Sequence, residues 1–273
     1  MNPGFRSSDA DPLELLELAT TCAVQAADFL VEGWSDRRVV STKSSGTDVV
    51  TQMDRGSENL LVETVLGQRP DDAIVGEEGG RREGTSGVTW VIDPLDGTVN
   101  YLYGLPVWAV SVGVLLEDRP VVGAVAAPGL ESVWTGVVAE EATMALLNGA
   151  HIRASDCERL EDALVGTGFG YQSEVRAEQG EVLASLLPRV RDIRRGGAAA
   201  VDLCWVAQGL LDAYYERGTH LWDRAAGTVI GQAAGALVGG LDGGEANDEM
   251  TIAANPALYQ LLRHEIAEAG GWA

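Results

Sequence analysis

An apolar stretch that ends in two aspartates constrains this chain more than any other feature of its sequence. Residues 90–92 are apolar and favour a buried strand, and Asp93 and Asp96 follow them with Pro94 in between. Proline lacks the amide hydrogen that a central strand needs, so we expect the strand to end there, while Gly97 lets the backbone turn. Both carboxylates then lie at one edge of a sheet. Two buried acids so close together repel each other unless a cation compensates for their charge.

Two further acids also lie next to the end of an expected strand or the start of an expected helix. Glu77 follows a short apolar run, residues 73–75, and Asp223 lies at the start of a helix rich in small residues. Carboxylates are the ligands that hard cations such as Mg²⁺ prefer, so a shared oxygen-ligand site is one interpretation. The alternatives that involve no metal are an exposed loop around Glu77, a helix N-cap at Asp223, and a simple turn at Asp93 and Asp96. Sequence spacing does not decide between them.

The charge of the chain argues against some classes of partner. It contains 41 acidic and 19 basic residues, which give a formal charge of -22. Such a field repels nucleic acid and anionic membrane surfaces, so we expect neither as a partner. A phosphate substrate would need concentrated positive charge, and bound divalent cations are the natural source. An acidic surface without further meaning is the alternative.

The pattern of helices and strands predicts one compact unit with two lobes that share a core and form a cleft where they meet. We expect an α+β lobe over residues 1–147 and an α/β lobe over residues 148–273, without a linker between them. Expected helices span residues 13–33, 54–67, 174–187, 199–209, 222–234 and 256–269. Expected strands include residues 73–75, 88–92, 109–116, 121–127, 132–138, 163–167 and 213–215, with others ending at residue 194 and lying near residue 252.

The sequence indicates a cytoplasmic protein. Cys22, Cys157 and Cys204 are widely spaced in mostly apolar surroundings, so we expect reduced, buried thiols rather than disulfides or a zinc site. The N-terminal residues lack the pattern of a secretory signal. The longest uncharged apolar run, residues 104–116, is too short to span a bilayer.

Three segments of the chain resemble the signature motifs of the inositol monophosphatase family. They are Gly76 to Glu78, Trp90 to Asn100, and Trp222 to Gly227, and their order and separation are similar to those of the family. The similarity covers the chain from about residue 13 to residue 262. The resemblance implies a layered αβαβα sandwich of the sugar-phosphatase type. It also implies a homodimeric, lithium-sensitive phosphomonoesterase that depends on two to three Mg²⁺ ions.

The same resemblance implies how each site residue would act. One Mg²⁺ would be held by Glu77, Asp93 and the carbonyl of Leu95, a second by Asp93, Asp96 and Asp223, and a third, weaker ion by Glu77 and waters. Glu77 would also belong to the catalytic set, in which Thr98 orients the attacking water and Asp54 accepts a hydrogen bond from its hydroxyl. Read alone, Asp54 is typical of a helix cap.

Substrate contacts are implied as well. The amides of Gly97 and Thr98 would bind the phosphate, and the polyol would contact Asp96, the backbone at Gly197 and Ala199, Glu216 and Asp223. Lys43 matches a family lysine near the metals, although a solvated lysine is an equal alternative. Glu216 is otherwise read as a surface charge. Ala198 stands where many relatives have a hydroxyl residue, so one substrate hydrogen bond is missing.

The function expected from this resemblance is hydrolysis of myo-inositol 1-phosphate, or a similar polyol monophosphate, by water attacking in line. Alternatives within the enzyme class are phosphatases for histidinol phosphate, fructose 1,6-bisphosphate or a nucleotide 3'-phosphate, because relatives share one metal site across these substrates. A non-enzymatic alternative is a regulatory role with a protein partner.

Overall fold

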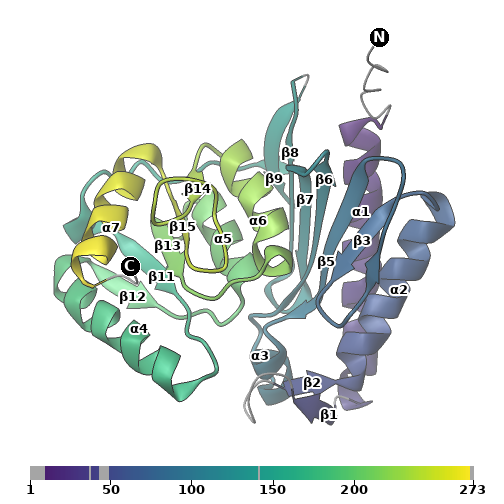
Figure 1. Ribbon diagram of the computed structural model, residues 1–273, viewed down its shortest axis with the longest axis horizontal. Coiled ribbons are helices and arrows are strands. Elements are labelled where there is room, and N and C mark those ends of the chain that lie inside the picture. The colour runs from purple at the N-terminus through teal and green to yellow at the C-terminus, as the bar shows by residue number, and fades with distance from the viewer. Residues whose placement is uncertain (1–9, 37, 43–48, 141, 271–273) are drawn as a thin grey trace.

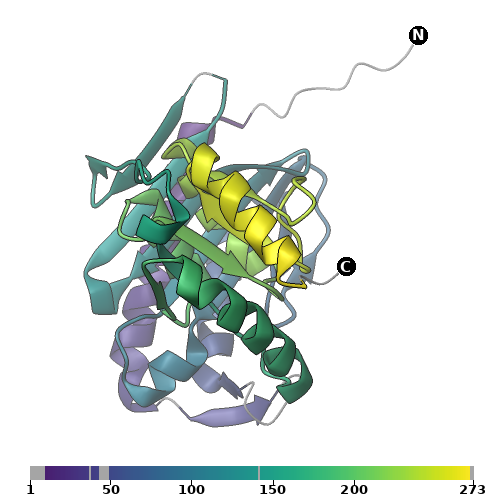
Figure 2. The ribbon, with the colours of Figure 1, turned by 90° about the vertical axis from the view of Figure 1, so that its left-hand side faces the viewer.

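Five layers of helices and strands make up the fold, shown as a computed structural model in Figure 1. The structure describes residues 10–36, 38–42, 49–140 and 142–270. In order, the layers are α1 (Pro12–Glu32) with α2 (Gln52–Gln68), an eight-stranded sheet, α5 (Ala199–Ala207) with α6 (Leu221–Ala233), a five-stranded sheet, and α4 (Ser173–Leu186) with α7 (Pro256–Glu268). Figure 2 shows α4 and α7 side by side on the outer face. The αβαβα sandwich expected from the sequence is confirmed.

The order of strands explains why acids from separate segments can meet. The larger sheet runs β10 (Ala150–His151), β9 (Thr143–Leu147), β8 (Ser132–Val138), β7 (Arg119–Ala127), β6 (Ala109–Leu116), β5 (Val88–Asp96), β3 (Ala73–Gly76) and β4 (Arg81–Arg82). The smaller sheet runs β12 (Asp192–Arg194), β11 (Leu164–Thr167), β13 (Ala213–Glu216), β15 (Thr251–Ala254) and β14 (Leu237–Gly239). β3 is parallel to β5, and β11 to β13, so their carboxyl ends share an edge.

The remaining elements are short. β1 (Val39–Thr42) pairs with β2 (Val49–Thr51), and α3 (Thr98–Tyr103) lies beside β2. Single 3₁₀ turns occupy residues 33–36, 128–130, 160–162 and 187–189. Within the described ranges, no helix is long and apolar enough to cross a membrane. All three cysteines are free thiols, and Cys22 and Cys204 are buried as expected, whereas Cys157 is half-buried.

The first helix follows from its sequence signals. Asp11 caps it, because its Oδ1 accepts a hydrogen bond from the Leu13 amide at 2.8 Å, and Pro12 occupies the first turn. The helix ends at Glu32, next to the predicted limit. Its buried residues, among them Ala19 and Ala23, pack against the larger sheet, so small side chains allow the close approach of these two layers.

The strand β5 differs from the expectation. The prediction that Pro94 ends it is wrong, because the strand continues to Asp96, which pairs with Ala109 of β6. The register shifts between Asp93 and Asp96, so Pro94 lies in an irregular part of the ladder. The amide hydrogen that proline lacks therefore costs little stability there. The hydroxyl of Ser57 in α2 donates to the Pro94 carbonyl at 2.8 Å. The two aspartates are therefore separated by a β-bulge whose backbone is held by Ser57 of α2.

A row of glycines brings the middle helices close to the larger sheet. Gly113, Gly123 and Gly136 pair directly across β6, β7 and β8. A Cβ atom at Gly123 would collide with the carbonyl of Ala226 in α6, and one at Gly136 would lie 2.8 Å from Cα of Ile230. The helix α6 therefore packs directly on the backbone of the sheet.

The two halves of the chain share apolar contacts at this layer. One buried cluster contains Val125 and Trp134 from the first half and Val201 and Ile230 from the second. The predicted boundary between residues 147 and 148 falls between β9 and β10, which pair in the larger sheet. Where the domains divide stays a prediction.

Candidate active site

One cavity of about 460 Å³ lies where the carboxyl end of β5 faces the start of α6 and the carboxyl end of β13. Its lining includes ten of the residues that the sequence predicted, namely Glu77, Asp93, Leu95, Asp96, Gly97, Thr98, Gly197, Ala199, Glu216 and Asp223. Asp54 is buried next to Thr98 and does not line the cavity. Lys43 lies outside the described residues. The structure thus gathers residues from both halves of the chain around one space.

The strand β5 brings two carboxylates to the cavity. Asp93 is buried, and its Oδ1 accepts a hydrogen bond from the Leu95 amide at 3.0 Å. Asp96 accepts at Oδ2 from the amide of Ala200, in the first turn of α5, at 2.7 Å. This second bond ties the first half of the chain to the second. Because β3 runs parallel beside β5, Glu77 emerges at the same edge of the sheet.

Burial and mutual repulsion raise the pKa values of these acids. Burial, together with the charges of Glu77, Asp96 and Asp223, raises the pKa of Asp93 well above its usual range. Burial raises the pKa of Asp96 to about 7, and the charges of Glu216 and Glu77 add to this effect. Burial and the charges of Glu77 and Asp96 likewise raise the pKa of Asp223 well above its usual range. The charged forms therefore need a compensating cation.

Thr98 begins α3 and faces a buried acid on α2. Its hydroxyl lies 3.2 Å from Asp54 Oδ1 and 3.1 Å from the Leu95 carbonyl oxygen, and its single proton can go to only one of them. Asp54 Oδ2 accepts from the amide of Thr51 at 2.8 Å and from its hydroxyl, which completes a capping box on α2. Burial raises the pKa of Asp54 to about 6, although the Thr51 hydrogen bonds lower it. Capping and contact with Thr98 are therefore compatible.

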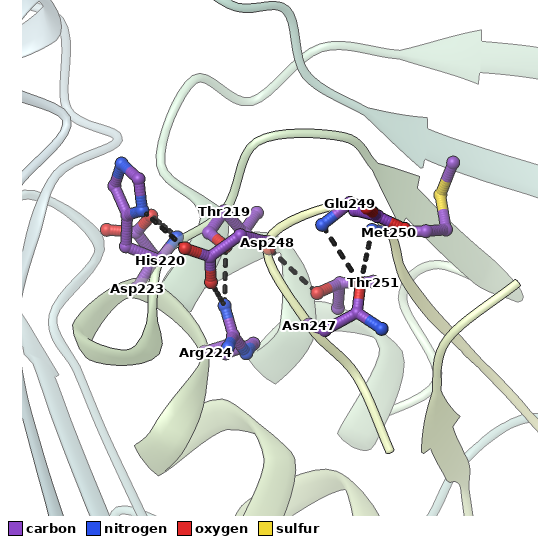
Figure 3. Close-up of polar contacts among 9 residues, drawn as sticks. All are labelled: Thr219, His220, Asp223, Arg224, Asn247, Asp248, Glu249, Met250 and Thr251. Carbon is purple, nitrogen blue, oxygen red and sulfur yellow. Dashed lines mark hydrogen bonds and ion pairs between the residues drawn. The ribbon is translucent and has the colours of Figure 1, made fainter. Parts of the chain in front are cut away.

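A network of polar contacts surrounds the start of α6 (Figure 3). The amide of His220 donates to Asp223 Oδ2 at 2.6 Å, so the N-cap is His220, and Asp223 stands three residues further on. Asp248 binds with both carboxylate oxygens, one 3.1 Å from His220 Nδ1 and the other 2.8 Å from the guanidinium of Arg224. Arg224 also donates to the Thr219 carbonyl. The loop that carries Asp248 thereby holds the turn in front of Asp223.

Glu216 lies at the carboxyl end of β13 and is not a surface charge, because it is half-buried and lines the cavity. The hydroxyl of Tyr214, which is fully buried, donates to Glu216 Oε2 at 2.6 Å. A Cβ atom at Gly168 would overlap the Glu216 carboxylate, so glycine leaves the space that this side chain occupies. Burial raises the pKa of Glu216, and the Tyr214 hydrogen bond lowers it.

Some residues of the cavity had no role in the sequence-based account. Arg195 and Arg217 line it, together with His220, Trp222 and residues 169–172. The two arginines add positive charge to the cavity, beside any that bound cations would supply. Arg195 stands beside a second arginine and just before Gly197, which was a signal in a chain this poor in bases. Arg217 gave no comparable signal.

The donor set fits a hard divalent cation. Asp93, Asp96 and Asp223, which offer carboxylate oxygens, and Leu95, which offers a carbonyl, line one cavity. Burial and mutual repulsion raise the pKa values of the three aspartates, so a bound cation would stabilise their charged forms. Among the residues that the structure describes, no three His, Cys, Asp or Glu side chains are grouped so that they could hold one ion by themselves. Mg²⁺ keeps several waters and takes one or two carboxylates, so it suits such a spacing.

Comparison with known proteins identifies the family of this chain. The inositol monophosphatase family matches residues 11–270 of the chain. The inositol-1-monophosphatase of Mycobacterium bovis is 43% identical over 246 residues, which cover 84% of this chain and 85% of that protein. The Nus factor SuhB of Pasteurella multocida is 35% identical over 257 residues, which cover 92% and 95%. The solved structure of Mycobacterium tuberculosis SuhB matches with a TM-score of 0.82 and 38% identity, and covers 96% of this chain and 99% of that one. The chain therefore belongs to the inositol monophosphatase family of phosphatases.

Proposed function

We propose that this chain hydrolyses the phosphate monoester of a small polyol, with myo-inositol 1-phosphate as substrate, in a reaction that depends on Mg²⁺. The observation that carries the proposal is the convergence of Glu77, Asp93, Asp96 and Asp223 on a cavity that Glu216 also lines. The four carboxylates that would bind metal and the one that would bind hydroxyl groups of the substrate then line the same cavity. Membership of a metal-dependent phosphatase family supports the reaction class.

We propose that two to three Mg²⁺ ions bind at these donors, with water molecules completing the ligand set of each ion. Glu77, Asp93 and the Leu95 carbonyl would hold one ion, Asp93, Asp96 and Asp223 would hold a second, and Glu77 with waters would hold a third. When bound, the ions supply positive charge to the phosphate and the leaving oxygen and lower the pKa of the attacking water.

The side chains around the ions would orient water and phosphate. When the Thr98 hydroxyl donates to Asp54 Oδ1, its own oxygen is left to accept a hydrogen bond from water. Asp54, with a pKa of about 6, is mostly ionised at neutral pH and can accept a proton through this contact. Glu77 faces the same cavity and completes the catalytic set. The amides of Gly97 and Thr98 would bind phosphate oxygens.

The remaining lining residues would bind the polyol. Asp96, Glu216 and Asp223 offer carboxylate oxygens, which are good acceptors for hydroxyl groups, and Gly197 and Ala199 offer backbone groups. Because Tyr214 and Gly168 constrain Glu216, this acceptor has a defined position.

Phosphate release from myo-inositol 1-phosphate, measured with Mg²⁺ and with EDTA, tests the proposal. We expect release that requires the metal. Asp93→Asn should abolish turnover while the circular dichroism spectrum and a cooperative melt remain. Asp156→Asn is the control, because Asp156 is exposed and pairs with Arg153. Release that is absent or independent of metal would refute the proposal.

Histidinol phosphate, fructose 1,6-bisphosphate and nucleotide 3'-phosphates are the alternative substrates. A panel ranked by kcat/KM separates them from the inositol ester. A preference of more than about tenfold for another ester, equivalent to about 1.4 kcal/mol in the barrier, would replace our choice.

A role with a protein partner is favoured by one observation, the similarity to a Nus factor of Pasteurella multocida. The charge of -22 opposes direct contact with RNA but allows a protein partner. If Asp93→Asn restored a deletion phenotype although it lacks turnover, this second function would be supported over catalysis.

Three further properties belong to the same proposal. We expect a homodimer, which light scattering coupled to gel filtration will measure, and a cytoplasmic location, which fractionation will measure. We also expect inhibition by millimolar Li⁺ through competition at a metal position. Activity that Li⁺ leaves unchanged would contradict that expectation.

A further inference from the structure

Three side chains on the buried face of α2 contact segments that carry residues of the candidate active site. Asp54, Ser57 and Glu58 are spaced so that they share one face of the helix, and all three are buried. Asp54 contacts Thr98, and Ser57 holds the Pro94 carbonyl within the bulge of β5. The first two side chains thus support the segment that carries Asp93 and Asp96. Glu58 has a different target.

Glu58 binds the loop that carries Glu77. Its Oε2 accepts a hydrogen bond from the Glu78 amide at 2.8 Å, and its Oε1 accepts from the Gly80 amide at 2.9 Å. The loop is closed by a bond of 2.7 Å from the Gly76 amide to the Gly80 carbonyl. Hydrogen bonds from backbone amides to a charged carboxylate are among the stronger ones in proteins. Glu58 therefore fixes the backbone directly after Glu77.

Two glycines leave room for this carboxylate. A Cβ atom at Gly76 would lie 2.6 Å from Glu58 Oε2, and one at Gly80 would lie 2.9 Å from Oε1. Both distances are shorter than real Cβ contacts. Glycines on both sides of Glu77 therefore let the carboxylate of Glu58 enter the loop.

We propose that Glu58 is a positioning residue, which binds the amides of Glu78 and Gly80 so that Glu77 is directed into the cavity with the geometry that Mg²⁺ binding requires. The proposal rests on the proposed function in one respect, namely that Glu77 is a metal ligand. It adds a residue that touches neither metal nor substrate.

Glu58→Gln tests this role. The variant replaces one acceptor oxygen by an amide that can only donate, so one loop amide loses its partner and faces another donor. We expect the Kd for Mg²⁺, measured by isothermal titration calorimetry without substrate, to rise about tenfold, as for the loss of one hydrogen bond to a charged group. The Mg²⁺ concentration for half-maximal activity should rise equally, and kcat at saturating Mg²⁺ should stay within about twofold.

Controls separate positioning from folding. Glu63→Gln changes an exposed acid of the same helix and should leave the Kd for Mg²⁺ unchanged. Gly80→Ala, which displaces the same carboxylate, should raise that Kd as Glu58→Gln does. An unchanged Kd in both test variants, or a loss of kcat alone, would overturn the proposal. If the wild type binds Mg²⁺ but hydrolyses no phosphate ester, the proposed function fails, while the Kd comparison still decides the role of Glu58.

Discussion

Asp54 divides its two carboxylate oxygens between the backbone and the active site. One oxygen caps α2 at Thr51, and the other receives the Thr98 hydroxyl. Asp96 and Asp223 show the same division, since each gives one oxygen to a backbone amide and lines the cavity as well. For Asp54 and Asp223, the sequence offered helix capping and a role in the site as alternatives. A carboxylate can do both, because its two oxygens accept independently.

At this scale we predict the effect of Asp54→Asn. The variant keeps the cap but removes the proton acceptor, so kcat should fall by roughly 10²- to 10⁴-fold. At saturating Mg²⁺, which should lower the pKa values of the metal-binding acids, kcat/KM of the wild type should decline as the pH falls through about 6, where Asp54 becomes protonated, and this decline should be weaker in the variant. Steady-state assays from pH 5 to 9 measure both effects. The matched control is Asp28→Asn on the exposed face of α1.

A second prediction concerns the stability of Asp54→Asn. The folded-state pKa of Asp54 lies above its ordinary value, so its ionisation destabilises the fold increasingly as the pH rises through about 6. The free energy of unfolding of Asp54→Asn at pH 8 should therefore equal or exceed that of the wild type. A variant with wild-type kcat would remove Asp54 from the mechanism.

At the scale of helices and strands, the sequence predicted most of the elements, because apolar patterning and capping signals are local. The strand β8 and the start of α1 were found in this way. The continuation of β5 past Pro94 was missed, because it depends on the partner strand and on Ser57. The contacts of Glu58 and Asp248 were missed for the same reason, since their partners lie about twenty or more residues away along the chain. Glu77 could be predicted to line the cavity because it follows β3, and Asp93 because it follows the apolar run of residues 90–92 within β5.

The contact between Asp248 and the start of α6 gives a prediction at this scale. Asp248→Asn leaves the guanidinium of Arg224, which is mostly buried, without its charged partner. We expect the free energy of unfolding to fall by only about 1 kcal/mol, because Asp248 itself is 61% exposed and screened by solvent. The Kd for Mg²⁺ should rise, since Asp223 follows the turn that Asp248 holds.

Chemical denaturation and calorimetry measure these two effects. Asp242→Asn is the control, because Asp242 caps Gly244 within the same loop and has no bond to α6 among the described residues. Equal Mg²⁺ affinity in Asp248→Asn and Asp242→Asn would show that the loop has no influence on Asp223.

At the scale of the whole molecule, the cavity forms where residues from the two halves of the chain meet. Asp93 and Asp96 come from the larger sheet, whereas Asp223 and Glu216 come from the layers beyond it. The sequence predicted a cleft between lobes, but it could not show that Asp223 meets Asp93 there. That proximity depends on how α6 packs on the larger sheet.

The assembled acids predict a stability that depends jointly on metal and pH. Raised carboxylate pKa values mean that the folded chain holds more protons than the unfolded chain, so without metal its stability should fall as the pH rises from about 4 through 7. Mg²⁺ should offset the repulsion and flatten this slope. Thermal melts between pH 5.5 and 8, with EDTA or with Mg²⁺, measure the difference. Parallel curves in the two conditions would contradict a metal site at these acids.

Packing of α6 on the glycine row gives the last prediction. Gly123→Ala places a methyl group against the backbone of Ala226 and should reduce the free energy of unfolding by about 1–3 kcal/mol through overpacking. Gly67→Ala is the control, because a Cβ atom there meets nothing within 4 Å. Denaturant melts compare the two variants, and equal midpoints would show that α6 can move away from the sheet without loss.

The glycine row also bears on how relatives of this chain can diverge. Because α6 rests on bare backbone at Gly113, Gly123 and Gly136, an insertion or a bulkier residue in these strands would displace Asp223 from the other acids. The rim of the cavity also includes residues 169–172, which lie outside this row of glycines. A change of substrate preference should therefore disturb the metal site less when it arises at the rim of the cavity than when it arises in the strands on which α6 packs.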